Sequence, residues 1–403
     1  MTIPHLPAEI LDHIVDHLHD AGGALRNCCL VSKSWIPRTR KRLFADITIR
    51  TEDDLKSWTE MFPDPSSSLA CYARTLSVQC PDAITDVNAG ADGWIRGFSR
   101  VTHLEMGGYR TINVMPADET KNSLVPLYGF SPAIKSLRID CIPFSSSQTL
   151  DFVLSFPLLE DLAVLNPYDV STGDLGGLDG QPTAVQPSSL PAFTGFLELY
   201  QAGMDPFSRW LLALPGGMHF RELRLTWFCR EDLPLTTRLV EGCPSTLESL
   251  DIASSFHGMF LEVCVRTNNS LLFPVGPALG SFSLSKATNL RDVIFRLTTL
   301  GIEWIIIALQ TITPGHRNLQ RISIEVPYYL TCVGANANVS RIVGEAVFER
   351  WSELDHLLIQ LWESRSIRPK VIHTTMRGGP YSAKDFIGRL LPEMTKREMI
   401  ALV

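Results

Sequence analysis

The chain has 403 residues, of which 45% are apolar and 20% are charged, as in an ordinary globular protein. Its formal net charge is −7, whereas dedicated nucleic-acid-binding proteins carry a basic surplus, so we expect no nucleic-acid partner. The longest apolar run, Trp304–Leu309, is far shorter than the roughly 20 residues needed to cross a bilayer, and we expect no membrane partner.

The nine cysteines are scattered along the chain and form no Cys-x-x-Cys pair. Five of them lie in apolar or strand-like contexts: Cys80, Cys141, Cys229, Cys264 and Cys332. Such cysteines are typical of small buried side chains in a reducing compartment. The first residues lack the basic region and apolar run of a secretory signal. We therefore expect a cytoplasmic or nuclear protein.

The first fifty residues predict three short helices. Pro7 suits the first turn of a helix, where its missing N–H is not needed, and Ile10, Ile14 and Leu18 follow at helical spacing. The glycine pair 22–23 is expected to end this first helix. Three helices of this length are too few to bury a core by themselves.

A second helical stretch is expected to follow the glycine pair, with Leu25, Cys28 and Leu30 as its apolar positions. A third is expected from Trp35 to Phe44, with Ser32 or Ser34 as its cap.

From residue 70 onward, the pattern apolar-x-x-apolar-x-apolar recurs at irregular intervals of roughly 30 residues. We count ten copies, which start at Ala73, Val101, Ile134, Leu159, Gly195, Phe220, Leu247, Leu290, Leu319 and Leu354. The alternation within each copy is typical of a short strand with one buried face. Many copies at such a period indicate a solenoid.

The segments between the copies include helix-like stretches, such as Asp205–Leu214 and Gly301–Gln310. Stacked strand–helix units predict an α/β solenoid: an irregular horseshoe whose inner wall is a parallel sheet, with helices outside. The connection Asn166–Phe193 is rich in Gly, Pro, Ser and Thr and is expected to be a long loop.

The chain is expected to end in a cap that covers the last repeat. A helix that Pro392 breaks and a second helix after it are indicated by the apolar residues Phe386, Ile387, Leu390, Leu391, Met399, Ile400 and Leu402. The sequence thus divides into a helical segment at 1–50, a solenoid at 51–365 and a cap at 366–403.

Residues 4 to about 47 resemble an F-box of the type common in mushroom-forming fungi. The resemblance is carried by Leu6-Pro7, Glu9-Ile10, the block Cys28–Trp35 and the close at Arg40–Phe44. Residues 73 to about 360 resemble degenerate leucine-rich repeats. This sequence departs from that family in lacking the asparagine that follows each strand, which leaves the curvature open.

The resemblance implies a substrate-recognition subunit of an SCF-type cullin-RING ubiquitin ligase. The F-box would dock on the Skp-type adaptor, and the solenoid would bind an unknown target protein. By position in the motif, the adaptor-binding residues would be Leu6, Pro7, Ile10, Ile14, Leu18, Leu30, Val31 and Trp35. The alternative from the pattern alone is that the apolar stripe packs on the first repeat.

The residues between the apolar positions of each strand are expected to face the concave surface, where the target would bind. The candidate contacts on that surface are Glu105, Arg138, Phe196, Glu198, Tyr200, Arg224, Asp251, Arg296 and Arg321. This face is polar, mixed and mildly acidic, which favours a protein partner of basic character. Phe196, Tyr200 and Arg224 come from adjacent copies and are a candidate hot spot, against the alternative of an ordinary solvated strand face.

No motif for catalysis or for a cofactor is visible. His13 and His17 are four residues apart, but no third metal ligand is evident, so we expect no metal. The glycine-rich stretch 173–180 matches no phosphate-binding motif. We therefore expect a non-enzymatic adaptor without cofactor. Two alternatives stay open: an interaction scaffold that binds Skp without a ligase, and an enzyme with its site in the loop at 166–193.

Overall fold

The computed structural model describes residues 7–18, 22–64, 68–79, 92–107, 132–140, 146–165, 191–200, 204–227, 233–254, 282–297, 302–326, 345–365, 367–373 and 387–402. The chain forms two compact units, unit 1 at residues 1–192 and unit 2 at 193–403. Several predictions fall outside the described residues: Leu6, Phe386, the five cysteines in strand-like contexts and nearly all of the loop at 166–193.

Unit 1 begins with the three predicted helices, α1 (Ala8–His17), α2 (Gly22–Val31) and α3 (Ile36–Leu43). The glycine pair 22–23 forms the first residues of α2, so its expected role as a simple terminator of the first helix is too narrow. Neither predicted serine caps α3, because Trp35 takes the N-cap position and Pro37 occupies the first turn. Thr39 of α3 is fully buried and donates a hydrogen bond to the Trp35 carbonyl, 2.7 Å away.

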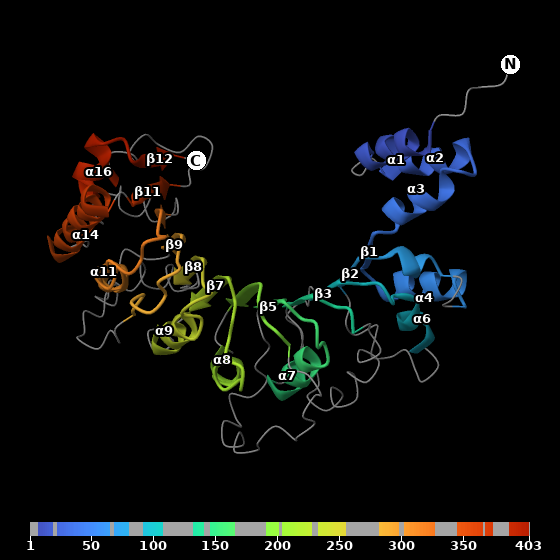
Figure 1. Ribbon diagram of the computed structural model, residues 1–403, viewed down its shortest axis with the longest axis horizontal. Coiled ribbons are helices and arrows are strands. Elements are labelled where there is room, and N and C mark those ends of the chain that lie inside the picture. The colour runs from blue at the N-terminus through green and yellow to red at the C-terminus, as the bar shows by residue number, and fades with distance from the viewer. Residues whose placement is uncertain are drawn as a thin grey trace, which may run out of the picture. The chain divides into compact units, whose positions relative to one another are not determined.

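In the described part of unit 1, the sheet has five parallel strands in chain order. They are β1 (Asp46–Ile49), β2 (Thr75–Val78), β3 (His103–Gly107), β4 (Ser136–Asp140) and β5 (Asp161–Leu165). The connections contain α4 (Glu52–Met61), η1 (Leu69–Tyr72), α6 (Asp92–Gly97) and α7 (Ser146–Leu154), and Figure 1 shows α4, α6 and α7 on one side of the strands. Strand β1, which was not among the ten predicted copies, pairs directly with β2 and extends the sheet towards α3.

Among the residues of unit 2 that the structure describes, the sheet has seven parallel strands, again in chain order. They are β6 (Phe196–Tyr200), β7 (Glu222–Trp227), β8 (Ser249–Ser254), β9 (Asp292–Arg296), β10 (Arg321–Val326), β11 (Arg368–His373) and β12 (Ile400–Leu402). The helices between them are α8 (Met204–Leu212), α9 (Leu233–Glu241), α11 (Glu303–Gln310), α14 (Glu345–Arg365) and α16 (Pro392–Lys396). Helices α8 and α11 confirm the two helical stretches predicted between the copies.

The apolar positions of the copies that form strands make up the core, as predicted. In the copy at Phe220, the side chains of Phe220, Leu223 and Leu225 are completely buried, and the next copy repeats this burial. Burying one such side chain stabilises the fold by about 1.5–3 kcal/mol. Repeats that bury the same number of such side chains therefore contribute similar amounts of stability. Because side chains alternate across a strand, burial of this face leaves the opposite face of each sheet open.

Backbone hydrogen bonds hold consecutive repeats in register just before each strand. The carbonyl of Gly195 accepts from the N–H groups of Arg221 and Glu222, at 2.8 and 3.2 Å. The carbonyl of Arg221 accepts in the same way from the next repeat, and those of Glu248 and Arg291 continue the series. A carbonyl oxygen has two lone pairs and can satisfy two donors. The register therefore depends on main-chain atoms at positions where the side chain varies.

The last predicted copy is wrong, because Leu354–Ile359 lies inside helix α14 instead of forming a strand. The buried residues Trp351, Leu354, Leu358 and Leu361 recur at helical spacing. The actual strand is β11, where buried Ile367, Pro369 and Val371 alternate with outward-facing residues.

The C-terminal prediction also needs correction. Residues 387–390 are helical and this helix ends before Pro392, as predicted, but Pro392 itself begins a further helix, α16, since a proline is well placed in the first turn. The residues after it form strand β12 and not a second helix.

Asp355 joins α14 to α16. Its carboxylate accepts hydrogen bonds from the backbone N–H groups of Glu393 (2.7 Å) and Met394 (3.0 Å), in the first turn of α16. The side chain is buried, and this burial raises the pKa of the carboxyl, while the two N–H groups act in the opposite direction. Asp355 thus caps one helix from the interior of another.

We expect Asp355→Ala to lower the free energy of unfolding by about 2 kcal/mol, because two buried N–H groups lose their acceptor. Asp355→Asn keeps one acceptor oxygen and should cost less. Urea unfolding of the full chain measures both, with Glu353→Ala on the exposed side of the same helix as the control. Equal stability of Asp355→Ala and Glu353→Ala would contradict this capping role.

Candidate protein-interaction surfaces

The N-terminal helices expose large apolar side chains to solvent. On α1, Ile10 is 47% exposed and Ile14 is 38% exposed; on α2, Leu30 is 85% exposed and Val31 is also exposed. We call these four side chains the N-terminal apolar residues. The helices bury other residues instead, namely Val15, Leu25 and Cys28. The unit's core thus takes one side of these helices and leaves a second apolar set uncovered.

Of the remaining predicted adaptor-binding residues, Pro7 is exposed, and Leu18 and Trp35 are half-buried. Ile10 and Ile14 lie one turn apart and therefore share a face of α1.

An ion-pair network ties α1 to α3. Asp16 on α1 accepts hydrogen bonds from Arg38 at 2.6 Å and from Arg42 at 2.7 Å. These bonds, with Arg38 the larger cause, lower the pKa of the Asp16 carboxyl to about 2. Asp12 adds a looser contact to Arg38 at 3.7 Å. Arginines one turn apart on α3 thus fix the position of α1, which carries Ile10 and Ile14.

The second surface is the face of each sheet that lies opposite the buried core; we call it the open face. In unit 1, it carries Glu105 on β3 and Arg138 on β4, which are register partners. Their side chains form an ion pair at 3.6 Å, and both are more than 40% exposed. This pair confirms that the two predicted residues share a face.

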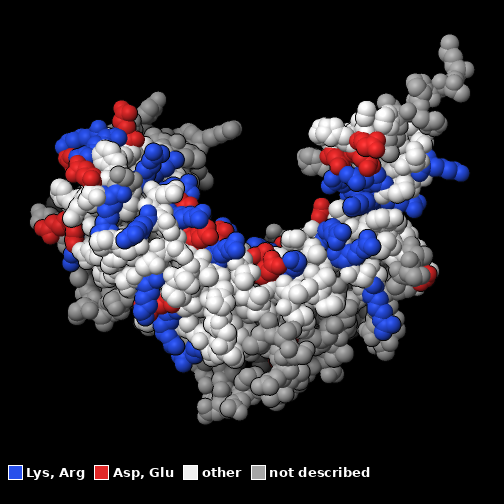
Figure 2. Space-filling model, in the orientation of Figure 1, with Lys and Arg blue, Asp and Glu red and all other residues white. Residues whose placement is uncertain are grey.

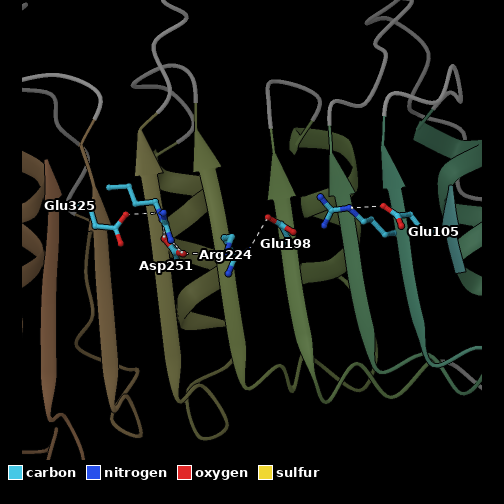
Figure 3. Close-up of polar contacts among 7 residues, drawn as sticks. Glu105, Glu198, Arg224, Asp251 and Glu325 are labelled. Atoms are coloured by element: carbon cyan, nitrogen blue, oxygen red, sulfur yellow. Dashed lines mark hydrogen bonds and ion pairs between the residues drawn. The ribbon is translucent and has the colours of Figure 1, made fainter. Parts of the chain in front are cut away.

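On the open face of unit 2, five side chains from five consecutive strands form one chain of ion pairs (Figure 3). Arg224 contacts Glu198 at 3.4 Å and Asp251 at 3.2 Å. Arg296 donates to Asp251 at 2.7 Å and pairs with Glu325 at 2.8 Å. Acid and base therefore alternate from β6 to β10, and Figure 2 shows the two charges interleaved.

Asp251 is the central member of this chain, which we call the ion-pair chain. Its side chain is only 4% exposed, whereas both arginines that it holds are 43% exposed. The hydrogen bonds that Arg296 donates to Asp251 raise the pKa of the Arg296 guanidinium. A buried acid shared by two arginines fixes both guanidinium groups in place.

The predicted hot spot is partly an internal contact. The Arg224 guanidinium lies over the ring of Phe196, 5.3 Å from its centroid, in a cation–π arrangement. Tyr200 is half-buried on the same face, two residues further along β6 than Glu198. The structure brings the three residues to neighbouring strands, β6 and β7.

At the C-terminal end of unit 2, Arg321 on β10 pairs with Asp292 on β9 at 2.9 Å. Arg368 and Lys370 lie beside it on β11. They were not among the predicted contacts, because the last strand was predicted at Leu354, in the segment that forms helix α14. The alternation of Ile367 and Val371 with these two cations was the signal in the sequence that could have found them.

The fold class follows from these elements. Parallel strands in chain order, with recurring apolar positions buried on one face and helices in the connections, define an α/β solenoid of the leucine-rich-repeat class, and this prediction is confirmed.

The chain matches no known family profile, and it matches no curated protein. Among solved structures, the leucine-rich repeat-containing protein LegL7 from Legionella pneumophila is similar at 12% identity, with a TM-score of 0.38. The similarity covers 86% of this chain and 98% of that one. A likeness this distant carries no argument about activity.

Two further findings concern the described residues. No helix in the described ranges is long and apolar enough to cross a membrane. Nor do three or more histidines, cysteines or acids gather anywhere in those ranges at a spacing that would hold a metal ion. The rings of His13 and His17 lie with their centroids 4.3 Å apart and are tilted by 53° to each other.

We expect Asp16→Asn to loosen α1 and to do so in a pH-dependent way. Because its pKa is lowered, the Asp16 carboxylate stabilises the folded chain at pH values above its ordinary pKa of 3.8. This stabilisation is lost as the pH falls through the lowered pKa of about 2. Hydrogen exchange of α1 and α3 amides should therefore be faster in the variant near neutral pH. This difference should shrink between pH 4 and pH 2, and a constant difference would contradict the assignment.

We expect Asp251→Ala to lower the free energy of unfolding by about 2 kcal/mol. Loss of a buried acid leaves two arginines without their shared partner, an effect reduced here by the solvent that reaches both guanidinium groups. Glu105→Ala breaks a pair that is exposed on both sides and should cost about 0.5 kcal/mol or less. Urea unfolding compares the two, and similar losses would show that Asp251 has no special role.

Proposed function

We propose that this protein is the substrate-recognition subunit of an SCF-type cullin-RING ubiquitin ligase. In this proposal, the N-terminal helices act as an F-box that docks on a Skp-type adaptor, and the open face of the solenoid binds the target protein. One observation carries the proposal: the N-terminal apolar residues are exposed at positions where the F-box pattern implies adaptor contacts.

The alternative of a stripe that packs on the first repeat fits this exposure poorly. A helix that only sealed the end of the sheet would bury all of its apolar positions. In α1, Val15 is buried in this way. Ile10, Ile14 and Leu30 are instead available to a partner, and full burial of one such side chain is worth about 1.5–3 kcal/mol. A few large apolar anchors of this kind dominate many protein interfaces.

The proposed role requires no catalytic residue in this chain. The adaptor end and the target-binding face belong to one polypeptide, so a bound target is held at a high effective concentration near the ligase. We accordingly propose a non-enzymatic function without cofactor, with cytoplasm or nucleus as its location. The free thiols support a reducing compartment: Cys28 and Cys243 are buried, and burial raises the pKa of the Cys243 thiol to about 12.

We expect Ile14→Asp and Leu30→Asp each to weaken binding to a purified Skp-type adaptor by about 30-fold or more, because a charge replaces an apolar anchor. Isothermal titration calorimetry measures the affinity. The matched control is Met61→Asp, which changes another exposed apolar residue of unit 1 at the end of α4 and should bind normally.

Circular dichroism checks that each variant keeps its fold. Unchanged adaptor binding by both Ile14→Asp and Leu30→Asp would refute the docking role. Affinity purification of the wild-type chain then separates two outcomes: recovery of cullin and RING subunits supports the ligase, whereas Skp alone supports a scaffold outside it.

A further inference from the structure

The charges on the open face of unit 2 are unevenly distributed among its described strands. Strands β6–β8 carry three acids and one arginine: Glu198, Glu222, Asp251 and Arg224. Strands β9–β11 carry two acids and four cations: Asp292, Glu325, Arg296, Arg321, Arg368 and Lys370. The face is therefore acidic towards β6 and basic towards β11, a polarity that the overall charge of −7 does not reveal.

The basic end centres on three side chains of two neighbouring strands, Arg321, Arg368 and Lys370, which we call the basic cluster. The register pairs Arg321 with Arg368 and places Lys370 beside buried Ser323. Neighbouring strands lie about 4.8 Å apart, and alternate residues of one strand about 6.6 Å apart, so the three charges share a small area. All three side chains are exposed, and Figure 2 shows basic side chains at this end of unit 2.

The acids of this region are already engaged. Asp292 pairs with Arg321, and Glu325 pairs with Arg296, which also holds Asp251. Within the described residues, neither Arg368 nor Lys370 is in an ion pair. Like charges on adjacent strands repel one another, so the cluster carries an uncompensated positive charge that an anionic partner would neutralise.

Within the described residues, the last strand, β12, pairs only with Val371–His373, so no described strand pairs with Arg368–Lys370 on that side of β11. Ile372 lies half-buried on the same face, one step beyond Lys370, and offers an apolar contact next to the charges.

We propose that the basic cluster binds an acidic segment of the target protein. This inference rests on the proposed function only in taking the open face of unit 2 as the target-binding surface. The sequence predicted a basic partner, because the residues expected on the concave surface are mildly acidic in total. The arginines of the ion-pair chain already neutralise acids of that face, so we expect an acidic partner instead. Three cations are too few for a nucleic-acid groove, whose contacts track many phosphates.

The test uses the full-length chain and a fluorescein-labelled peptide of alternating glutamate and serine, with fluorescence anisotropy at low salt as the readout. We expect the wild type to bind this peptide, and we expect the lysine–serine and glutamine–serine counterparts not to compete. Arg368→Glu/Lys370→Glu should weaken binding about 10-fold or more, as expected when two charge contacts become repulsive.

The matched control is Arg238→Glu/Arg317→Glu, which makes the same change in net charge on exposed residues of α9 and of the turn before β10. It should bind the acidic peptide like the wild type. An equal loss of peptide affinity in both double variants would show that only overall charge matters, which would contradict a site at the basic cluster. Absence of peptide binding by the wild type would overturn the proposal. Tighter binding of oligo-dT than of the acidic peptide would overturn it in favour of a nucleic-acid site.

Adaptor affinity is measured in the same samples, so that the two proposals fail separately. Loss of peptide binding with normal binding to the Skp-type adaptor affects the basic cluster alone. A wild-type chain that binds the acidic peptide but not the adaptor leaves the cluster valid and removes the ligase role.

Discussion

Burial of one face of the parallel strands is the constraint on which the rest of this protein depends. Three apolar side chains from each repeat, such as Phe220, Leu223 and Leu225, fill the interior at every step of the sheet. Because side chains alternate, this burial commits every second residue of each strand to the opposite face. The polar residues of that face are therefore placed by the core, with spacings set by strand geometry and not by loops.

The open face of unit 2 shows what this placement achieves. Asp251 is almost completely buried, yet it sits between two arginines that solvent reaches. A buried charge is costly unless it is paired. Here the paired arginines come from neighbouring strands, whose register the core already fixes. The result is a rigid polar surface whose two ends differ in charge. The N-terminal helices use the same division between a buried and an exposed set, with Val15 inside and Ile14 outside.

Nine of the ten strand copies, the helices α8 and α11 and the three N-terminal helices were predictable, because apolar spacing reports directly on burial. The tenth copy failed because Leu354 and Leu357, which with Ile359 match the repeat pattern, also fit helical spacing, and only tertiary packing decides between the two structures. Strand β1 was missed although Phe44, Ile47 and Ile49 fit the repeat pattern, because these residues adjoin the segment interpreted as helical, whereas β12 has only three residues. The ion-pair chain was partly predicted: its members were on the candidate surface, but which acid meets which arginine depends on side-chain reach across the register, as with Arg296 and Asp251.

The doubled hydrogen bonds to one carbonyl before each strand have an evolutionary consequence. Since Gly195, Arg221 and Glu248 contribute the same main-chain oxygen, unlike side chains serve equally well at this point of the repeat. The positions that connect consecutive repeats are therefore under little selection for a particular side chain. The side chains at these positions can be exchanged without disturbing the hydrogen bonds to the next repeat, so a chain built in this way can change them one substitution at a time while its architecture persists.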